Sequence, residues 1–248
     1  MIITGIIPAR FASTRFPGKP LALIHGKPMI RLVYEQAMKS KSLSGVVVAT
    51  DDDRIVEAVR QFGGEVMMTK PEHPSGTDRC NELVERLLSS GRTMDVVVNI
   101  QGDEPFIHPD QIDLVCSCFK DPEVGIATLV KRIHTQEELF NPSVNKVIID
   151  KFKNALYFSR SPIPFQQSVS RDEWHNSFCY FKHIGIYGYR VGVLNEISRL
   201  EPSALEKAES LEQLRWIENG YSIRVEETQL ESYSVDTPED ISKFTNMS

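Results

Sequence analysis

Three short apolar runs alternate with segments of helical spacing along the first hundred residues, and this alternation constrains the fold more than any other feature. The runs cover residues 2–7, 45–50 and 95–100. Between them, apolar residues recur every three or four positions, as in 30–38. Short continuous apolar strands separated by amphipathic helices predict a mostly parallel sheet with helices on both faces.

The second half of the chain has a more mixed pattern. Strands, some of them antiparallel, are expected at 125–130, 144–149, 155–159, 183–189 and 222–227. We interpret the polar, proline-containing stretch 161–176 as a mobile loop near the site, and 205–219 as one helix closed by Gly220. The expected result is a single α/β domain over 1–248, with a smaller mixed part inserted in it.

The charge balance excludes some classes of partner. A formal net charge of -6 and a pI of about 5.6 argue against a protein that binds nucleic acid or an anionic membrane surface. No apolar run reaches about 18 residues, so we expect no membrane span, and the N-terminus lacks the features of a signal peptide. The 4 cysteines show no metal-ligand spacing and are expected to be reduced thiols of a cytoplasmic protein.

The first apolar run opens into a loop, residues 8–20, that carries Arg10, Arg15 and Lys19 and no acidic residue. Ligands of open α/β sheets bind beyond the C-terminal ends of strands. The loop therefore predicts an anion site, with a phosphate chain as the best candidate. It is not a Walker A motif, because a proline follows its Gly-Lys pair. A surface loop whose cations pair with carboxylates remains the alternative.

Two other stretches also occupy positions where ligands bind. Residues 101–105 follow the third apolar run, and 74–79 begin a helix whose free N–H groups and positive dipole end attract anions. Asp103 can hold Mg²⁺ or form a turn. Asp236 can hold the same metal or cap the last helix. From the residues alone, both alternatives stay open for each acid.

Taken together, eight stretches closely resemble the CMP-Kdo synthetase family, the 3-deoxy-manno-octulosonate (Kdo) cytidylyltransferases of Gram-negative lipopolysaccharide synthesis. They follow the order of the family from one end of the chain to the other: 7–21, 48–51, 75–79, 99–105, 155–160, 183–190, 211–215 and 235–240. The first stretch is shared with other sugar nucleotidyltransferases. Phe158-Ser159-Arg160 and 183–190 narrow the resemblance to the Kdo enzymes.

The resemblance implies a Rossmann-like nucleotidyltransferase fold, a homodimer, and CTP and Kdo as substrates. It also implies a Mg-assisted reaction in which the Kdo 2-hydroxyl attacks the α-phosphorus of CTP and diphosphate leaves. Residues 1–125 would mainly bind CTP, and 126–230 would mainly bind the sugar acid and form the dimer. Residues 231–248 would return a metal ligand and form the terminal helix.

The resemblance also assigns site residues by motif. The catalytic set is Arg10, Lys19, Asp103 and Asp236, of which Asp103 and Asp236 are the Mg²⁺ ligands. The nucleotide-binding set is Ala9, Arg10, Ser13, Lys19, Ser75, Gly76, Arg79 and Gln101. The substrate-binding set is Gln101, Arg160, His183, Tyr187, Glu212 and Gln213. Arg15 receives no assignment.

The chain departs from the family pattern at three places. Residues 231–234 stand where the family usually has a glycine-containing turn, and Lys182 stands where arginine is more usual. The stretch 168–178 contains nothing diagnostic. Two alternatives to a Kdo enzyme are a cytidylyltransferase for a related acid such as 8-amino-Kdo, and a nucleotide-binding protein without catalysis. The second alternative predicts loss of the metal carboxylates or the triphosphate cations, all of which are present.

Overall fold

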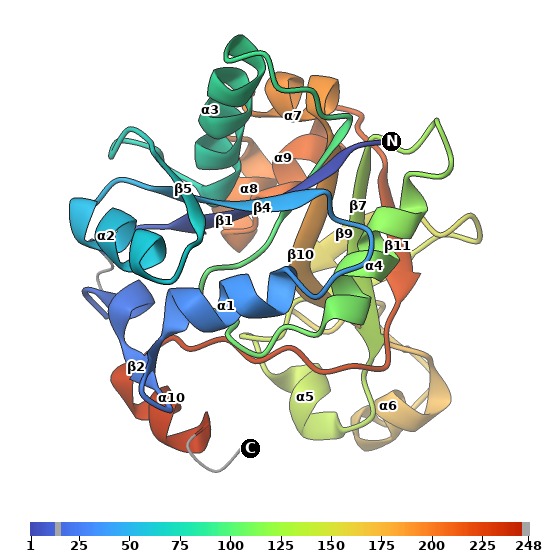
Figure 1. Cartoon of the computed structure of the whole chain (residues 1–248). Helices are drawn as coiled ribbons and strands as arrows, with labels where there is room; N and C mark the ends of the chain where they lie inside the picture. Colours follow the sequence, from blue (N-terminus) through green and yellow to red (C-terminus); the bar gives the residue numbers. More distant parts are fainter. Residues whose placement is uncertain (13–15, 245–248) are drawn as a thin grey trace.

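Nine strands form one sheet in the computed structural model, which describes residues 1–12 and 16–244 (Figure 1). The strands of the chain are β1 (Ile3–Ala9), β2 (Leu23–Ile24), β3 (Lys27–Pro28), β4 (Gly45–Thr50), β5 (Glu65–Met68), β6 (Val96–Asn99), β7 (Ile126–Arg132), β8 (Lys146–Ile149), β9 (Ala155–Ser159), β10 (Phe181–Arg190) and β11 (Ile223–Glu227). The helices are α1 (Met29–Ala37), α2 (Asp53–Gln61), α3 (Gly76–Ser89), α4 (Pro109–Cys118), α5 (Gln136–Phe140), α6 (Trp174–Ser177), α7 (Val191–Ile197), α8 (Ala204–Glu209), α9 (Gln213–Glu218) and α10 (Pro238–Phe244), with 3-10 turns η1 (Lys19–Leu21) and η2 (Arg171–Glu173).

The order of the main sheet is β11-β7-β10-β6-β1-β4-β5. The strands β6, β1, β4 and β5 are all parallel to their neighbours in this group. β10 is antiparallel to both β6 and β7, and it also pairs with β8 of the β8–β9 hairpin. The expected mostly parallel sheet with a mixed second part is therefore confirmed.

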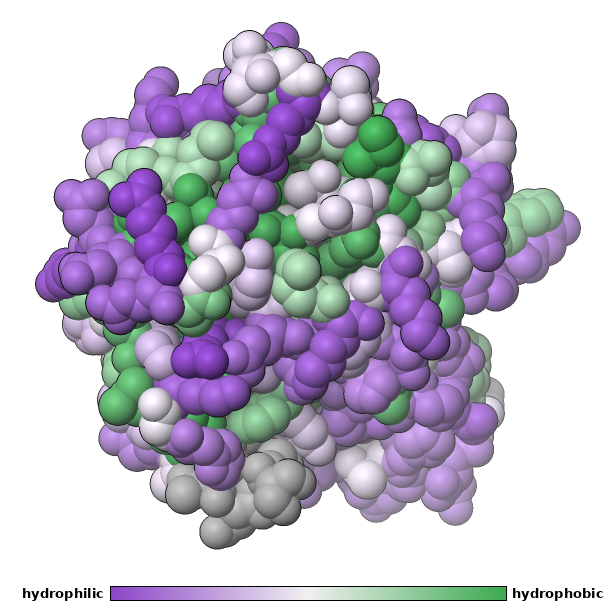
Figure 2. All heavy atoms as spheres, viewed as in Figure 1, coloured by the Kyte–Doolittle hydropathy of each residue, from purple (hydrophilic) through white to green (hydrophobic). Residues whose placement is uncertain are grey.

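Helices cover both faces of the sheet (Figure 1). One core cluster packs α1, α2 and α4 against apolar side chains of β1, β4 and β6. A second cluster packs α3, α7 and α9 against the opposite face. Burial of one valine, leucine or isoleucine side chain stabilises the folded state by about 1.5–3 kcal/mol. The two clusters therefore supply most of the favourable free energy of folding. On the face seen in Figure 2, hydrophilic residues dominate the lower half, and apolar residues gather across the upper half among charged side chains.

One helix expected from the sequence is interrupted. The stretch 205–219 forms two short helices, α8 and α9, because Ser210 adopts left-handed backbone angles (φ 53°, ψ 49°) between them. The cause is tertiary: Arg160 Nε donates to the Glu209 carbonyl at 2.7 Å, and Nη2 donates to the Ser210 carbonyl at 3.3 Å. These carbonyls, at the end of α8, accept from the side chain of Arg160, which directly follows β9.

The stretch 161–176 also differs from expectation, since it is not an irregular loop throughout. It contains η2 and the start of α6, and Trp174 is buried. Trp174 packs with Leu139 and Tyr180 in a small separate cluster. Its indole nitrogen donates to the Val169 carbonyl at 3.1 Å. Burial of this indole with its N–H satisfied fixes the position of Trp174 within the stretch.

The C-terminal segment returns to the beginning of the chain. After β11 it crosses below α1 in the view of Figure 1 and ends in α10, beside the β2–β3 hairpin. Val235 and Ile24 belong to one small core cluster there, with Ile241 packed against it. Within the described residues, no helix is long and apolar enough to cross a membrane.

Candidate active site

A cleft of about 320 Å³ lies where β1 and β6 end and α3 begins. It brings together residues from three of the motif stretches. The predicted site residues that line it are Ala9, Arg10, Lys19, Ser75, Gly76, Arg79, Gln101 and Asp103. Ser13, also predicted to bind the nucleotide, lies outside the described residues, as does Arg15.

The two loops of the cleft approach each other closely because of a glycine. A Cβ built on Gly102 would lie 2.6 Å from the carbonyl oxygen of Pro8, which is a backbone atom that cannot move aside easily. Only glycine therefore lets the loop after β6 lie against the end of β1. This approach places Asp103 opposite the cationic loop.

Lys19 joins three distant parts of the chain at the cleft. Its Nζ donates to Asp103 Oδ2 at 2.7 Å and to the Val235 carbonyl at 2.9 Å. The Val235 N–H in turn donates to the Asp103 carbonyl at 2.9 Å. Asp236 follows Val235 directly, so these bonds hold the main chain that leads into Asp236 against Lys19 and the loop of Asp103.

The predicted metal ligands Asp103 and Asp236 offer carboxylate oxygens, which suit a hard cation better than a soft one. Within the described part of the chain, no group of three or more His, Cys, Asp and Glu side chains could hold a metal. Two carboxylates, Asp103 and Asp236, suit Mg²⁺, which usually takes one or two protein carboxylates and completes its shell with waters and substrate phosphates. The main-chain N–H of Asp236 donates to Asp240 Oδ2 at 3.0 Å, so Asp240 caps α10.

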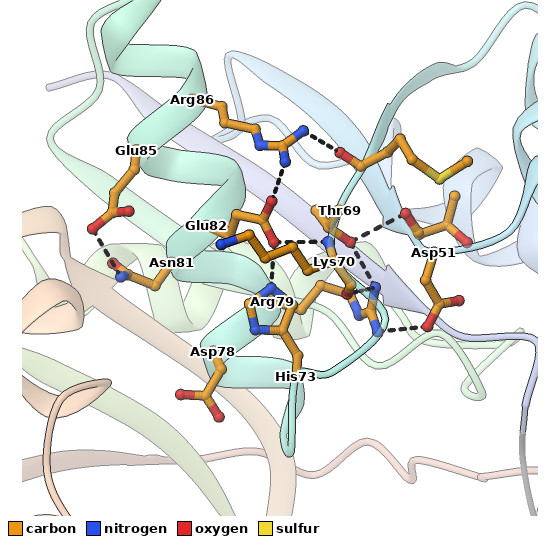
Figure 3. Close-up of polar contacts among 12 residues, drawn as sticks. Asp51, Thr69, Lys70, His73, Asp78, Arg79, Asn81, Glu82, Glu85 and Arg86 are labelled. Carbon is orange, nitrogen blue, oxygen red and sulfur yellow. Dashed lines mark hydrogen bonds and ion pairs between the residues drawn. The ribbon is translucent and has the colours of Figure 1, made fainter.

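Arg79 lies at the wall of the cleft, but other protein groups already occupy its guanidinium (Figure 3). Nη2 donates to Asp51 Oδ2 at 2.8 Å, and Nη1 donates to Thr69 Oγ1 at 2.6 Å and to the Lys70 carbonyl at 3.2 Å. The side chain is only 4% exposed. Arg79 thus fastens the first turn of α3 to the ends of β4 and β5.

Ser75 caps the same helix, since its Oγ accepts from the Asp78 N–H at 3.2 Å. His73 also lines the cleft and is paired with Glu82 of α3. Burial alone raises the pKa of Glu82, but hydrogen bonds from His73 and the Lys70 N–H lower it overall. Sequence reasoning missed His73, although it lies two residues before a quoted motif.

Four of the predicted sugar-acid residues lie on β10 and at the start of α9. His183 Nε2 lies 3.0 Å from Thr128 Oγ1, and burial lowers the pKa of His183 to about 3. The imidazole is therefore neutral at pH 7. Tyr187 stacks edge-on against Trp216, and its hydroxyl is buried without a hydrogen-bond partner among the described residues. A buried unpaired hydroxyl is costly, which is the condition expected of a group that meets a ligand or water.

Glu212 and Gln213, the other two of this group, begin α9 and are largely buried. Thr77 Oγ1 donates to Glu212 Oε2 at 2.8 Å, while burial raises the pKa of Glu212. Gln101 Nε2 donates to the Gly185 carbonyl of β10 at 3.0 Å. Thr77 and Gln101 therefore link this second group of residues to the cleft.

Arg160 lies at the end of β9, and its three guanidinium nitrogens donate to the carbonyls of Glu209, Pro142 and Ser210. The buried Lys146 holds the same loop through the Asn141 and Val144 carbonyls. Burial lowers the pKa of Lys146 to about 8. Sequence reasoning did not single out Lys146, because a lysine in a strand carries no signal of burial.

Glu104 is a third residue that sequence reasoning missed, although it stands inside the motif stretch 99–105. Its side chain is buried and accepts from the Ser232 hydroxyl. Burial, together with the neighbouring Asp103, raises the pKa of Glu104 to about 7.

Comparisons with known proteins agree on one family. A family model described as "Cytidylyltransferase" matches residues 4–228. A 3-deoxy-manno-octulosonate cytidylyltransferase of Parabacteroides distasonis is 55% identical over 247 residues, covering 98% of this chain and 96% of the relative. One of Cytophaga hutchinsonii is 51% identical, covering 99% of this chain and 97% of the relative.

Solved structures give the same result. A CMP:2-keto-3-deoxy-manno-octonic acid synthetase complexed with CTP superposes with a TM-score of 0.91 at 41% identity, covering 100% of this chain and 98% of that one. A cytidylyltransferase of Leptospira borgpetersenii, with a TM-score of 0.64 and 16% identity, shares the fold.

Proposed function

The chain belongs to the 3-deoxy-manno-octulosonate cytidylyltransferase family, and from that membership we propose that it converts CTP and Kdo into CMP-Kdo and diphosphate. The observation that carries the proposal is the pair of hydrogen bonds from Lys19 to Asp103 and to the Val235 carbonyl. They lie at a cleft lined by the motifs proposed to bind the triphosphate. These bonds join a cation and a carboxylate that line the cleft to the residue before Asp236, which supports the assignment of all three to a nucleoside triphosphate and its metal.

In the proposed reaction, the oxygen of the Kdo 2-hydroxyl forms a bond to the α-phosphorus of CTP. The bond from that phosphorus to the diphosphate oxygen breaks, and the hydroxyl proton is released. Transfer of this kind depends on positioning and charge stabilisation more than on a covalent nucleophile. Arg10 and Lys19, both at the cleft, stabilise the negative charge of the triphosphate and of the transition state.

Asp103 and Asp236 would hold Mg²⁺ beside the phosphates. When bound, the ion would neutralise phosphate charge and lower the pKa of the attacking hydroxyl. The bonds that hold Val235, the residue before Asp236, to Asp103 and Lys19 support this assignment.

We expect Asp103→Asn and Asp236→Asn each to lower kcat/KM by about 10²–10³-fold, equivalent to about 3–4 kcal/mol, with the protein still folded. Asp110→Asn is the matched control, because its side chain is 74% exposed on α4. Turnover within a few-fold of wild type in either test variant, with folding checked by circular dichroism, removes that residue from the metal site.

For the sugar acid, we propose contacts with Arg160, His183, Tyr187, Glu212 and Gln213. The unpaired Tyr187 hydroxyl and the link from Gln101 to β10 support this placement. A diphosphate-release assay with CTP, Mg²⁺ and a panel of sugar acids tests which acid is the substrate. Release with Kdo is expected. Release only with 8-amino-Kdo would change the substrate, and no release with any acid would overturn the enzyme assignment.

We further propose that the enzyme is a homodimer that supplies lipopolysaccharide synthesis from the cytoplasm. The four free thiols suit a reducing compartment. Exposed apolar side chains on β9 and in nearby loops, including Leu156 and Phe165, support association through the 126–230 part. Within this scheme, 1–125 mainly binds CTP, and 231–248 returns Asp236. Sedimentation equilibrium tests the dimer, and a purely monomeric protein would contradict it.

A further inference from the structure

The segment 228–237, here called the C-terminal strap, connects β11 with α10 without forming a helix or strand of its own. It crosses the molecule below α1 in Figure 1, and Asp236 lies near its end, directly after Val235. An irregular segment of this length does not hold a carboxylate in place by itself. Its position must come from the groups that it contacts.

The strap is fastened at both of its ends. At its beginning, the Thr228 N–H continues the sheet by donating to the Val130 carbonyl at 2.8 Å. At its end, Val235 is fully buried and bonded to both Asp103 and Lys19. Consecutive Cα atoms are about 3.8 Å apart, so a fixed Val235 strongly restricts where Asp236 can lie.

Between these ends, the strap contacts buried side chains at two places. Gln111 of α4, which is 1% exposed, donates through Nε2 to the Leu230 carbonyl at 3.5 Å. The Ser232 hydroxyl donates to Glu104 Oε2. Glu104 is 6% exposed, follows Asp103 directly, and lies against β10, where a Cβ on Gly185 would be 3.6 Å from its Oε1. One side chain therefore touches the strap, the loop of Asp103 and the strand that carries His183 and Tyr187.

A second, more exposed contact lies next to it. Glu231 pairs with Lys131 and with Lys182, the latter at 2.9 Å, and its side chain is 35% exposed. Lys131 and Lys182 are only 13% and 14% exposed, so this partly buried network also holds the strap at Glu231. Between Glu231 and Val235, the Ser232 hydroxyl ties the strap directly to the residue that follows Asp103.

We propose that Glu104 and Ser232 form a latch that positions Asp236 beside Asp103. Glu104 and Ser232 are positioning residues in this scheme, since they act through the strap and not on the substrate. The inference rests on the proposed function, because it takes Asp103 and Asp236 as the metal ligands.

The test compares Ser232→Ala with two matched variants. Ser234→Ala removes a hydroxyl from an exposed position of the same strap, and Ser232→Thr keeps the hydroxyl of the latch. The first readout is amide hydrogen exchange of Val235 in the full-length protein without metal. We expect exchange at least tenfold faster in Ser232→Ala, and wild-type exchange in the other two.

The second readout is the factor by which Mn²⁺ tightens CTP binding, measured by calorimetry without sugar acid. We expect this factor to fall at least fivefold in Ser232→Ala and to be unchanged in Ser234→Ala and Ser232→Thr. In an Asp236→Asn background, Ser232→Ala should cause no further fall, because the latch acts through Asp236.

Wild-type exchange and wild-type metal coupling in Ser232→Ala would overturn the latch. A further fall in the Asp236→Asn background would also overturn it, since the hydroxyl would then act by another route. Failure of the proposed function is a separate result: the wild-type enzyme would release no diphosphate from CTP and any sugar acid, whereas the exchange comparison would stand unaffected.

Discussion

Arg79 allows a direct test of whether a motif residue supports the cleft or contacts the nucleotide. In Arg79→Met, Asp51 loses the guanidinium whose Nη2 lies 2.8 Å from its carboxylate. The two side chains are only 4% and 10% exposed, so water screens the remaining charge poorly. Thr69 Oγ1 keeps a bond to the Thr50 carbonyl at 3.1 Å, so the carboxylate is the main group left unpaired.

The magnitude follows from this geometry. Removing one partner of a buried ion pair costs about 3–5 kcal/mol, mainly because the other charge stays buried. The lost bonds to Thr69 and Lys70 add to this cost, while the packing of methionine offsets part of it. We therefore expect Arg79→Met to lower the free energy of unfolding by about 3–5 kcal/mol, a large share of a typical total of about 5–15 kcal/mol.

Urea denaturation followed by circular dichroism measures this loss, with Arg86→Met as the control on the same helix. Arg86 is 46% exposed, so its loss should cost about 0–1 kcal/mol. The double variant Asp51→Asn/Arg79→Met should be more stable than Arg79→Met, because no charge is left unpaired. A cost below about 1 kcal/mol, with KM for CTP raised tenfold or more, would refute the structural explanation and make Arg79 a direct nucleotide contact.

Two further predictions concern the region around Arg160. Burial lowers the pKa of Lys146 from 10.5 to about 8 in the folded protein, so between these values the unfolded chain binds more protons and stability rises with pH. The free energy of unfolding of wild type minus that of Lys146→Met, from urea denaturation at each pH, should rise from pH 8 to 10.5, and a flat difference would contradict this. Ser210→Gly should raise the free energy of unfolding by up to about 1 kcal/mol, because Ser210 adopts left-handed angles that cost a side chain more than glycine; a lower melting temperature would show that the reasoning is wrong.

Much of the fold followed from local patterns. The three apolar runs of the first hundred residues became β1, β4 and β6, and Ser75 begins α3 as its capping residue. These predictions succeed because burial on both faces leaves a continuous apolar run, and an unsatisfied helix end calls for a short polar side chain. For the stretch 205–219 the prediction of one helix was wrong. Its local pattern is helical, but the pattern cannot show the contact with the distant Arg160.

The candidate site shows the same limit. The motifs named Arg10, Lys19 and Asp103 as members of one cleft, and the structure places all three there. The motifs could not tell that Arg79 is occupied by a partner 28 residues away. They also could not show what holds the C-terminal strap in place. In the sequence Glu104 is one more polar residue of a loop, and its contact with Ser232 is visible only in the structure.

The sequence by itself determined the parallel centre of the sheet, the helices on both its faces and the chemical character of the loops at its edge. Each of these is encoded in residues that are neighbours along the chain. Only the tertiary structure decided which of those groups meet. Lys19 reaches Val235 across 216 residues, because the sheet order and the return of the strap bring the two ends of the chain together. Side-chain partners of this kind depend on packing between elements, and local periodicity carries no information about that packing.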